Sequence, residues 1–215
     1  MPIADSGKLV NFRTDFVIGP SISPKKIAKL NSLRRNLHKN GLICQNPRGI
    51  GYGNASQRVG KNKFIITKTQ TGGKPRLTSN DYITIVETHP KESRVVAKGP
   101  GTEIGPSSEA ITHGVIYNMD NGDGKIRFIA HVHGIIHKHS KELGIPTIKE
   151  NVKYGSYDLT KSIKRLFKNN PAVRELCIFS MGKGHDGGII AFGKTQEKIN
   201  KIMTHYLKEA KKLAG

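Results

Sequence analysis

Hydrophobic and polar residues follow one another along the chain in two periodicities, one typical of helices and one typical of strands. Ile27, Leu30, Leu33 and Leu37 recur at the spacing of an amphipathic helix. Residues 81–87 alternate between apolar and polar side chains, as a half-buried strand does. The patterns predict helices over residues 24–39, 158–169 and 195–213, from about 106–109 to 119, and around 135–143. They predict strands over residues 63–68, 81–87, 93–98, 125–132, 175–180 and 188–192.

The segments between these elements predict one α/β domain over residues 1–215. Residues 1–22 are expected to form an extended lead-in. Residues 46–62 are rich in Gly, Asn and Ser, so we expect a loop there with at most a short strand. We find no internal repeat, low-complexity segment or linker that would divide the domain. The short Gly-rich connections between strands favour antiparallel or mixed pairing.

The charge of the chain suggests an anionic partner, but it is spread out. Lys and Arg number 36 and Asp and Glu 16, which gives a net charge of +20. Such a charge favours a polyanion or a phosphorylated substrate. Because aromatic residues are 6% of the chain and Trp is absent, stacking platforms for single-stranded nucleic acid are sparse. A generally basic surface is the better interpretation, and a nucleic acid partner is not expected.

Several classes of protein are excluded by simple features of the sequence. No apolar run approaches the ~18 residues that a membrane span needs. The first residues lack the basic and apolar segments of a secretory signal. Cys44 and Cys177 are too few for a disulfide framework, so we expect reduced thiols in a cytoplasmic protein.

Two histidines in one predicted strand are candidate metal ligands. His131 and His133 are two residues apart, so a strand would point both imidazoles to the same face, with Cα atoms ~7 Å apart. They could converge on a metal ion, or each could be an ordinary, partly buried histidine. A tetrahedral site needs at least a third protein ligand. His185, in a Gly-rich turn, and His137 are the candidates for that ligand.

Three small polar segments could bind an anion. Residues 51–58 and 65–73 offer backbone N–H groups, amides and hydroxyls. Ser107 or Ser108 can cap the helix that follows, which would place Glu109 in its first turn. Taken singly, each segment is better interpreted as an ordinary turn or cap.

The order of these motifs resembles the class II aldolase/adducin family. Asn-x-Ser-x-Arg, Ile-Thr-x-Thr, Ser-Ser-Glu, His-x-His and Gly-His-Asp-Gly-Gly follow one another between about residues 24 and 207. The resemblance implies a three-layer α/β/α fold, with a central, mostly antiparallel sheet flanked by helices. It also implies a homotetramer with sites at the subunit interfaces.

The resemblance assigns roles to individual residues. It implies Zn²⁺, or another divalent metal, held by His131, His133 and His185, and it implies that Glu109 is the catalytic carboxylate. It implies a substrate phosphate held by Gly53, Asn54, Thr69, Gln70, Ser107 and Ser108. Tyr52 and Gln70 depart from the usual phosphate loops, where a small residue and a glycine stand. Tyr154, Tyr157 and Tyr206 are candidates for a further acid or base.

The activity implied is that of a zinc-dependent aldolase. Such an enzyme cleaves or forms a phosphorylated ketose by retro-aldol chemistry through a metal-stabilised enediolate, giving dihydroxyacetone phosphate and an aldehyde. A sugar-phosphate dehydratase or epimerase of the same family is an alternative, as is a non-catalytic adducin-like interaction module. The epimerase branch tends to carry Asp at the position of Glu109, and interaction modules lose the metal ligands, so the aldolase is favoured.

Overall fold

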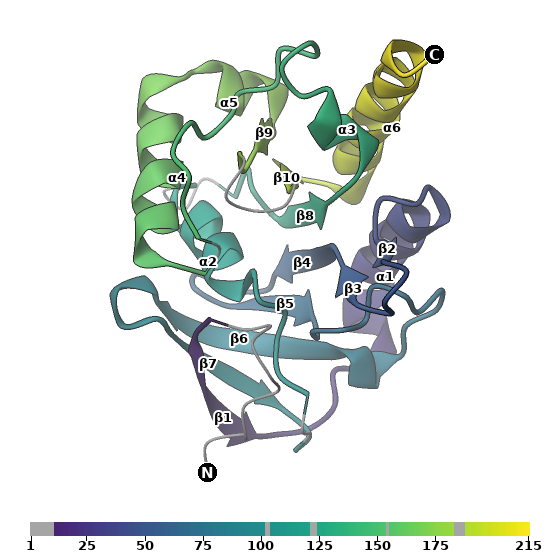
Figure 1. Ribbon diagram of the computed structural model, residues 1–215. Helices are drawn as coiled ribbons and strands as arrows, with labels where there is room; N and C mark the ends of the chain where they lie inside the picture. Colours follow the sequence, from purple (N-terminus) through teal and green to yellow (C-terminus); the bar gives the residue numbers. More distant parts are fainter. Residues whose placement is uncertain (1–10, 102–103, 121–123, 154, 183–187) are drawn as a thin grey trace.

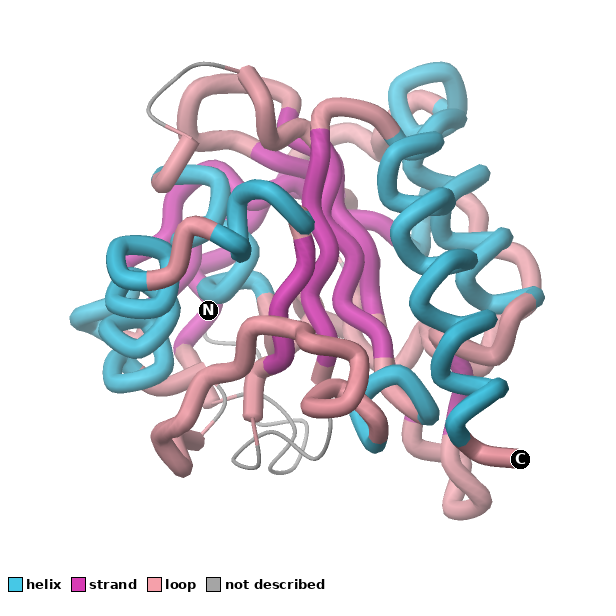
Figure 2. The backbone as a smooth tube through the Cα atoms, turned by 90° about the horizontal axis from the view of Figure 1, so that it is seen from above, coloured by secondary structure: helices cyan, strands magenta, loops and turns pink. Residues whose placement is uncertain are grey.

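A mixed β-sheet lies between helices on both of its faces. The computed structural model describes residues 11–101, 104–120, 124–153, 155–182 and 188–215. In Figures 1 and 2 the strands form a central layer with helices on either side. Within these ranges no helix is long and apolar enough to cross a membrane.

The sheet is antiparallel apart from one edge. Its described strands have the order β1-β7-β6-β5-β4-β8-β10-β9, and only the β1–β7 pair is parallel. The bounds are β1 (Arg13–Ile18), β4 (Asn54–Arg58), β5 (Phe64–Thr67), β6 (Tyr82–His89), β7 (Arg94–Gly99), β8 (Phe128–Val132), β9 (Ile178–Ser180) and β10 (Ile189–Gly193). A separate hairpin joins β2 (Cys44–Gln45) to β3 (Gly51–Tyr52). The predicted fold class is confirmed.

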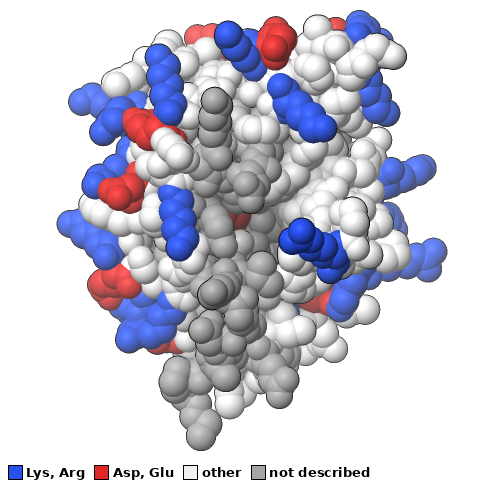
Figure 3. All heavy atoms as spheres, in the orientation of Figure 1, with Lys and Arg blue, Asp and Glu red and all other residues white. Residues whose placement is uncertain are grey.

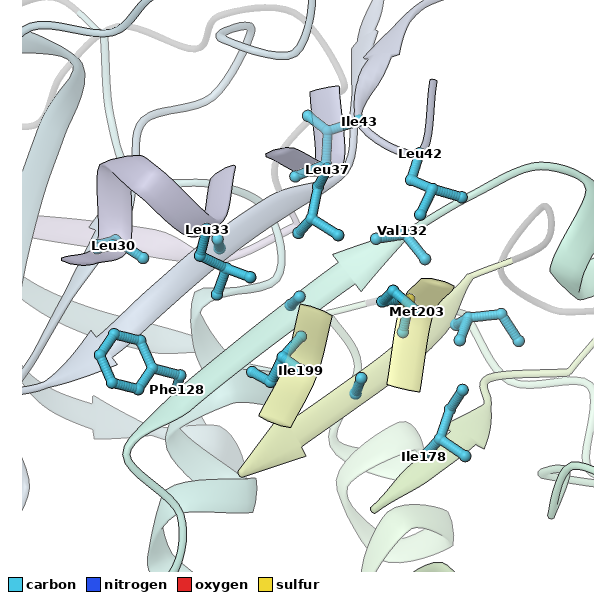
Figure 4. Close-up of a cluster of buried hydrophobic side chains, with 14 of the residues drawn as sticks. Leu30, Leu33, Leu37, Leu42, Ile43, Phe128, Val132, Ile178, Ile199 and Met203 are labelled. Carbon is cyan, nitrogen blue, oxygen red and sulfur yellow. The ribbon is translucent and has the colours of Figure 1, made fainter. Parts of the chain in front are cut away.

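The helices divide into two layers because neighbouring residues of a strand face opposite sides of the sheet. Phe128, Ala130 and Val132 of β8 pack with α1 (Pro24–Lys39) and α6 (Gln196–Leu213). Figure 4 shows this layer, with leucines of α1 above the strands and Ile199 and Met203 of α6 against them. The opposite face packs with α2 (Ala110–Asn118), α4 (Tyr157–Asn169) and α5 (Ala172–Leu176).

Local signals in the sequence set the bounds of the longer helices. Pro24 follows Ser23 at the start of α1, where a missing N–H costs nothing. Gly41, with φ 71°, follows its C-cap, Asn40. Thr195 begins α6 by accepting a hydrogen bond from the backbone N–H of Lys198 at 3.2 Å. The predicted bounds of both helices therefore agree with the structure to within a residue.

Several sequence predictions differ from the structure, among them the strand predicted over 125–132, which begins at Phe128. Residues 46–62, expected to be mostly loop, include β4, which lies between β5 and β8. The pattern did not predict this strand because its polar residues serve the candidate site rather than a hydrophobic face. The predicted helix over 135–143 is only the single turn α3 (Ile135–Lys138), followed by turns. The predicted strand over 175–180 begins at Ile178, since α5 continues to Leu176 and Cys177 ends it with φ 56°. The extended lead-in includes β1.

Candidate active site

The centre of the candidate site is the pairing of β4 with β8. Asn54, at the start of β4, is the register partner of His131 near the end of β8. Their side chains lie on the same face of the sheet, and Asn54 Nδ2 is 3.1 Å from His131 Nδ1. Both residues are buried. Pairing of the strands in this register therefore brings an amide and an imidazole together out of solvent.

His133 continues the same line of side chains beyond the strand. Its ring centroid lies 4.6 Å from that of His131 and 5.4 Å from that of Tyr52. His133 is half-buried, whereas His131 is 2% exposed. The two rings therefore lie at successive depths, from the buried sheet towards the surface. We call this pair of imidazole rings the His131–His133 step, or imidazole step.

The orientation of the Asn54 amide decides which nitrogen of His131 carries the proton. Asn54 Oδ1 is buried and has no hydrogen-bond partner among the described residues. The two ends of an amide are assigned from the hydrogen bonds they make. Turning the amide over places Oδ1 against Nδ1–H of His131 and leaves the lone pair on Nε2. That is the arrangement in which a second residue orients a metal-binding histidine, so the surroundings of His131 fit a metal ligand.

Glycine lets the start of β10 approach His131. A Cβ atom at Gly188 would lie 2.6 Å from His131 Nε2. A side chain at this position would therefore displace the ring.

The loops around this step are joined by backbone hydrogen bonds. Thr69 N–H donates to the Gly105 carbonyl at 3.1 Å, and Ser107 N–H donates to the Thr67 carbonyl at 3.2 Å. The Gly51 N–H donates to Gln70 Oε1 at 3.0 Å. The segments that carry the three predicted anion-binding motifs therefore lie side by side.

A buried arginine holds the middle loop. Arg34 of α1 is 1% exposed, and its guanidinium donates to the carbonyls of Thr71 at 2.7 Å and Gly72 at 2.8 Å. It also donates to the carbonyl of Lys74. Burial lowers the pKa of Arg34, and the neighbouring Tyr82 and Asp81 act in the opposite direction. Arg34 thus fixes the loop that begins at Thr69.

Glu109 lies at the first turn of α2 and is fully buried. The predicted hydroxyl cap is wrong in position. Glu109 is itself the N-cap residue, and Ser107 Oγ accepts the Glu109 N–H at 3.4 Å. A carboxylate at this end of a helix is favoured by the helix dipole.

A buried polar network continues from Glu109 along α2. One turn on, His113 Nδ1 is 2.7 Å from Ser56 Oγ, which is 2.8 Å from the Tyr117 hydroxyl. Burial lowers the pKa of His113 to about 4, although the nearby Glu109 acts to raise it. His113 is therefore neutral at pH 7.

Most, but not all, of the predicted site residues lie in the part of the chain that the structure describes. Asn54, His131 and His133 are in contact, and the segments of Gly53, Thr69, Gln70 and Ser107 adjoin them; Ser108, half-buried, lies between Ser107 and Glu109. His185 and Tyr154 lie outside the described residues. Within the described residues, no group of three potential metal ligands forms.

The other candidates for the third metal ligand and for the further acid or base have neighbours outside the pairing of β4 with β8. His137 Nδ1 lies 3.2 Å from Ser180 Oγ. Tyr206 packs in the core of the α1 and α6 layer, and Lys161 lies over the ring of Tyr157.

Two features of the site were not predicted from the sequence. Arg34 follows Leu30 by four residues and precedes Leu37 by three, a spacing that already places it on the buried face of the helix. Ser56 stands in a stretch predicted to be mostly loop, so its contact with His113 left no signal.

The match to a family of proteins decides the family to which the chain belongs. The family described as class II aldolase and adducin N-terminal domain matches residues 35–198. The chain belongs to this family. Among curated proteins, none matches the chain by sequence.

Solved class II aldolase structures share the fold. L-fuculose-1-phosphate aldolase from Thermus thermophilus is 20% identical, with a TM-score of 0.59 over 89% of this chain and 94% of that one. Another L-fuculose 1-phosphate aldolase is 15% identical, with a TM-score of 0.53 over 91% and 90%. An aldolase II superfamily protein from Pseudomonas syringae is 16% identical, with a TM-score of 0.55 over 90% and 77%. At these identities the likeness establishes the fold.

Gly72→Ala should destabilise the class II aldolase fold at the junction of the first two loops. The new Cβ would lie 2.3 Å from the Cys44 carbonyl oxygen and 2.6 Å from the Tyr52 nitrogen, both backbone atoms. We expect a loss of about 1–3 kcal/mol in the free energy of unfolding, measured in urea. Gly101→Ala, where nothing lies within 4 Å, is the control and should change stability by less than ~0.5 kcal/mol. Equal effects would contradict close contact of the loops.

The buried His113 should make the metal-free protein less stable in acid. Its pKa falls from 6.5 to about 4 on folding, so the unfolded chain binds more protons between these pH values. Stability is full above pH ~6.5 and is lost as the pH falls towards 4, by about 3 kcal/mol for this group. Urea unfolding with EDTA at pH 7 and pH 5 should show a smaller change in His113→Asn than in the original protein. An unchanged difference would contradict the neutral, buried imidazole.

Proposed function

We propose that the protein is a metal-dependent aldolase that cleaves or forms a phosphorylated ketose. The observation that carries the proposal is the meeting of three loops rich in anion donors beside the His131–His133 step, with Glu109 at the start of α2. The family and the structural neighbours named as L-fuculose-phosphate aldolases support a sugar phosphate as substrate.

The loops supply the binding energy for the phosphate. Gly53, Asn54, Thr69, Gln70, Ser107 and Ser108 are the proposed donors. Because Arg34 and the hydrogen bonds between loops fix the middle loop, little ordering is needed when substrate binds. A phosphate held in this way positions the carbon chain of the ketose for reaction.

His131 and His133, with His185 as the third ligand, would hold the divalent ion. When bound, that ion supplies Lewis-acid stabilisation of negative charge on the substrate oxygens. Asn54 contributes by orienting the imidazole of His131, as its 3.1 Å contact with Nδ1 indicates.

Glu109 is the proposed acid and base at carbon. In the cleavage direction, a solvent water accepts the proton of the hydroxyl beside the scissile bond, the carbon–carbon bond breaks and the aldehyde departs, while Glu109 stands ready in its protonated form. The electron pair stays on the triose phosphate fragment, and Glu109 delivers a proton to that carbon. Neutral His113, one turn further along α2, adds no positive charge beside the carboxyl group. In the synthesis direction Glu109 removes the same proton.

The direct test is release of dihydroxyacetone phosphate from a panel of ketose 1-phosphates by zinc-loaded protein. We expect cleavage of at least one member. Bound zinc without release of triose phosphate would overturn the aldolase proposal in favour of dehydration or epimerisation, and failure to bind zinc would favour an interaction module.

His131→Ala should remove most of the bound zinc without unfolding the protein. His205→Ala, at an exposed position on α6, is the matched control. Zinc per chain is measured by elemental analysis after dialysis, beside urea unfolding. Stoichiometric zinc in His131→Ala would exclude this histidine as a ligand.

Glu109→Gln should retain zinc but lose proton exchange at the substrate carbon. Incorporation of deuterium from D₂O into dihydroxyacetone phosphate, followed by NMR, should fall at least ~100-fold. Glu142→Gln, at an exposed position, should exchange at the original rate. Normal exchange in Glu109→Gln would remove Glu109 from the mechanism.

A further inference from the structure

A basic hollow opens at the other end of the strands that carry the candidate active site. It has a volume of about 950 Å³, within the range of small-molecule sites. Four cationic side chains line it, from Arg58, Lys61, Arg127 and Lys194. The amides of Asn62 and Asn118 and the ring of Tyr117 complete the polar part of its wall.

The hollow is separate from the site at His131. β4 begins with Asn54 at the candidate site and ends with Arg58 at the hollow, and four steps of ~3.4 Å put these ends ~14 Å apart. β8, β10 and α2 run between the same two places. In or directly beside these elements, the residues at the site end and at the hollow end are His131 and Arg127 for β8, Gly188 and Lys194 for β10, and Glu109 and Tyr117 for α2. One small ligand therefore could not occupy both places.

The wall of the hollow is held rigidly. Arg58 N–H donates to the Arg127 carbonyl at 2.8 Å, and Arg127 N–H donates to the Gly193 carbonyl at 2.9 Å. The Arg58 guanidinium forms an ion pair with Asp120 at 3.3 Å and lies 5.0 Å from the centre of the Tyr117 ring. Arg58 is thus committed to the structure of the wall rather than to a ligand.

Within the part of the chain that the structure describes, the other three cations have no such commitment. Lys61, Arg127 and Lys194 are exposed, and none of them forms an ion pair with a described residue. No carboxylate is among the described residues that line the hollow. Three positive charges around one concave surface repel one another and raise the local concentration of anions. On the face shown in Figure 3, Lys and Arg are spread out and interspersed with acidic residues.

We propose that this hollow is a second, non-catalytic site, which binds a small molecule carrying two or more linked phosphate groups. Three cations around one opening match several negative charges held close together, and the asparagine amides add donors for phosphate oxygens. The proposal does not depend on the function of the candidate active site.

The test is calorimetric titration with inorganic tripolyphosphate at ~0.15 M salt, where diffuse surface attraction is largely screened. In the hollow variant, Lys61, Arg127 and Lys194 are all replaced by Gln. In the control variant, Arg35, Lys164 and Lys211 are replaced by Gln. These residues are exposed away from the hollow, so the control loses the same three positive charges. We expect binding to weaken at least ~10-fold in the hollow variant and less than ~2-fold in the control.

Each other result overturns the proposal. Equal weakening in both variants would mean general attraction to a basic protein, and no weakening in either would place the anion elsewhere, including at the loops around His131. Absence of binding to the original protein would leave no site. A single-stranded RNA that loses affinity in the hollow variant, while tripolyphosphate does not, would reassign the hollow to nucleic acid.

Discussion

The pairing of β4 with β8 is the constraint on which the candidate site depends. Because a side chain's face is set by its place in the strand, this register puts Asn54 beside His131 and Ser56 beside Ile129 on one face. A shift by one residue would turn Asn54 and Ser56 towards α1 and α6 and break the contacts with His131 and His113. The apolar residues between them, Ala55 and Ala130, pack on the opposite face and hold the register.

The same pairing explains why β4 has so few apolar residues. Asn54 and Ser56 are buried, but both have polar partners, so their burial satisfies hydrogen bonds instead of filling a core. Arg58, at the end of the strand, is bound to the Tyr117 carbonyl and to Asp120. The face of the sheet towards α2 is therefore apolar at its margins and polar in the middle, where the chemistry is proposed.

The apolar and polar parts of the sheet also differ in how far the sequence could predict them. Helix α1, with apolar residues at regular spacing, and strand β6, with its alternation, follow from local pattern because each buries a hydrophobic stripe. β4 could not be predicted, since the reason for its polar residues lies in β8 and α2. His131, His133 and Glu109 were proposed from their motifs, but their exposure and the capping arrangement at Glu109 required the fold. Arg34 could have been found from its place in the stripe of α1, whereas its partners, the carbonyls at residues 71–74, could not.

The separation of the site residues along the chain has a consequence for how the protein folds. Asn54 and His131 are 77 residues apart, and Ser56 and His113 are 57 apart. Closing such loops costs entropy that only the completed central sheet repays, and proteins dominated by distant contacts fold slowly. No fragment of the chain contains the site in advance of that step. The imidazole step therefore exists only where the central sheet is formed, so its integrity reports on the whole domain rather than on any one element.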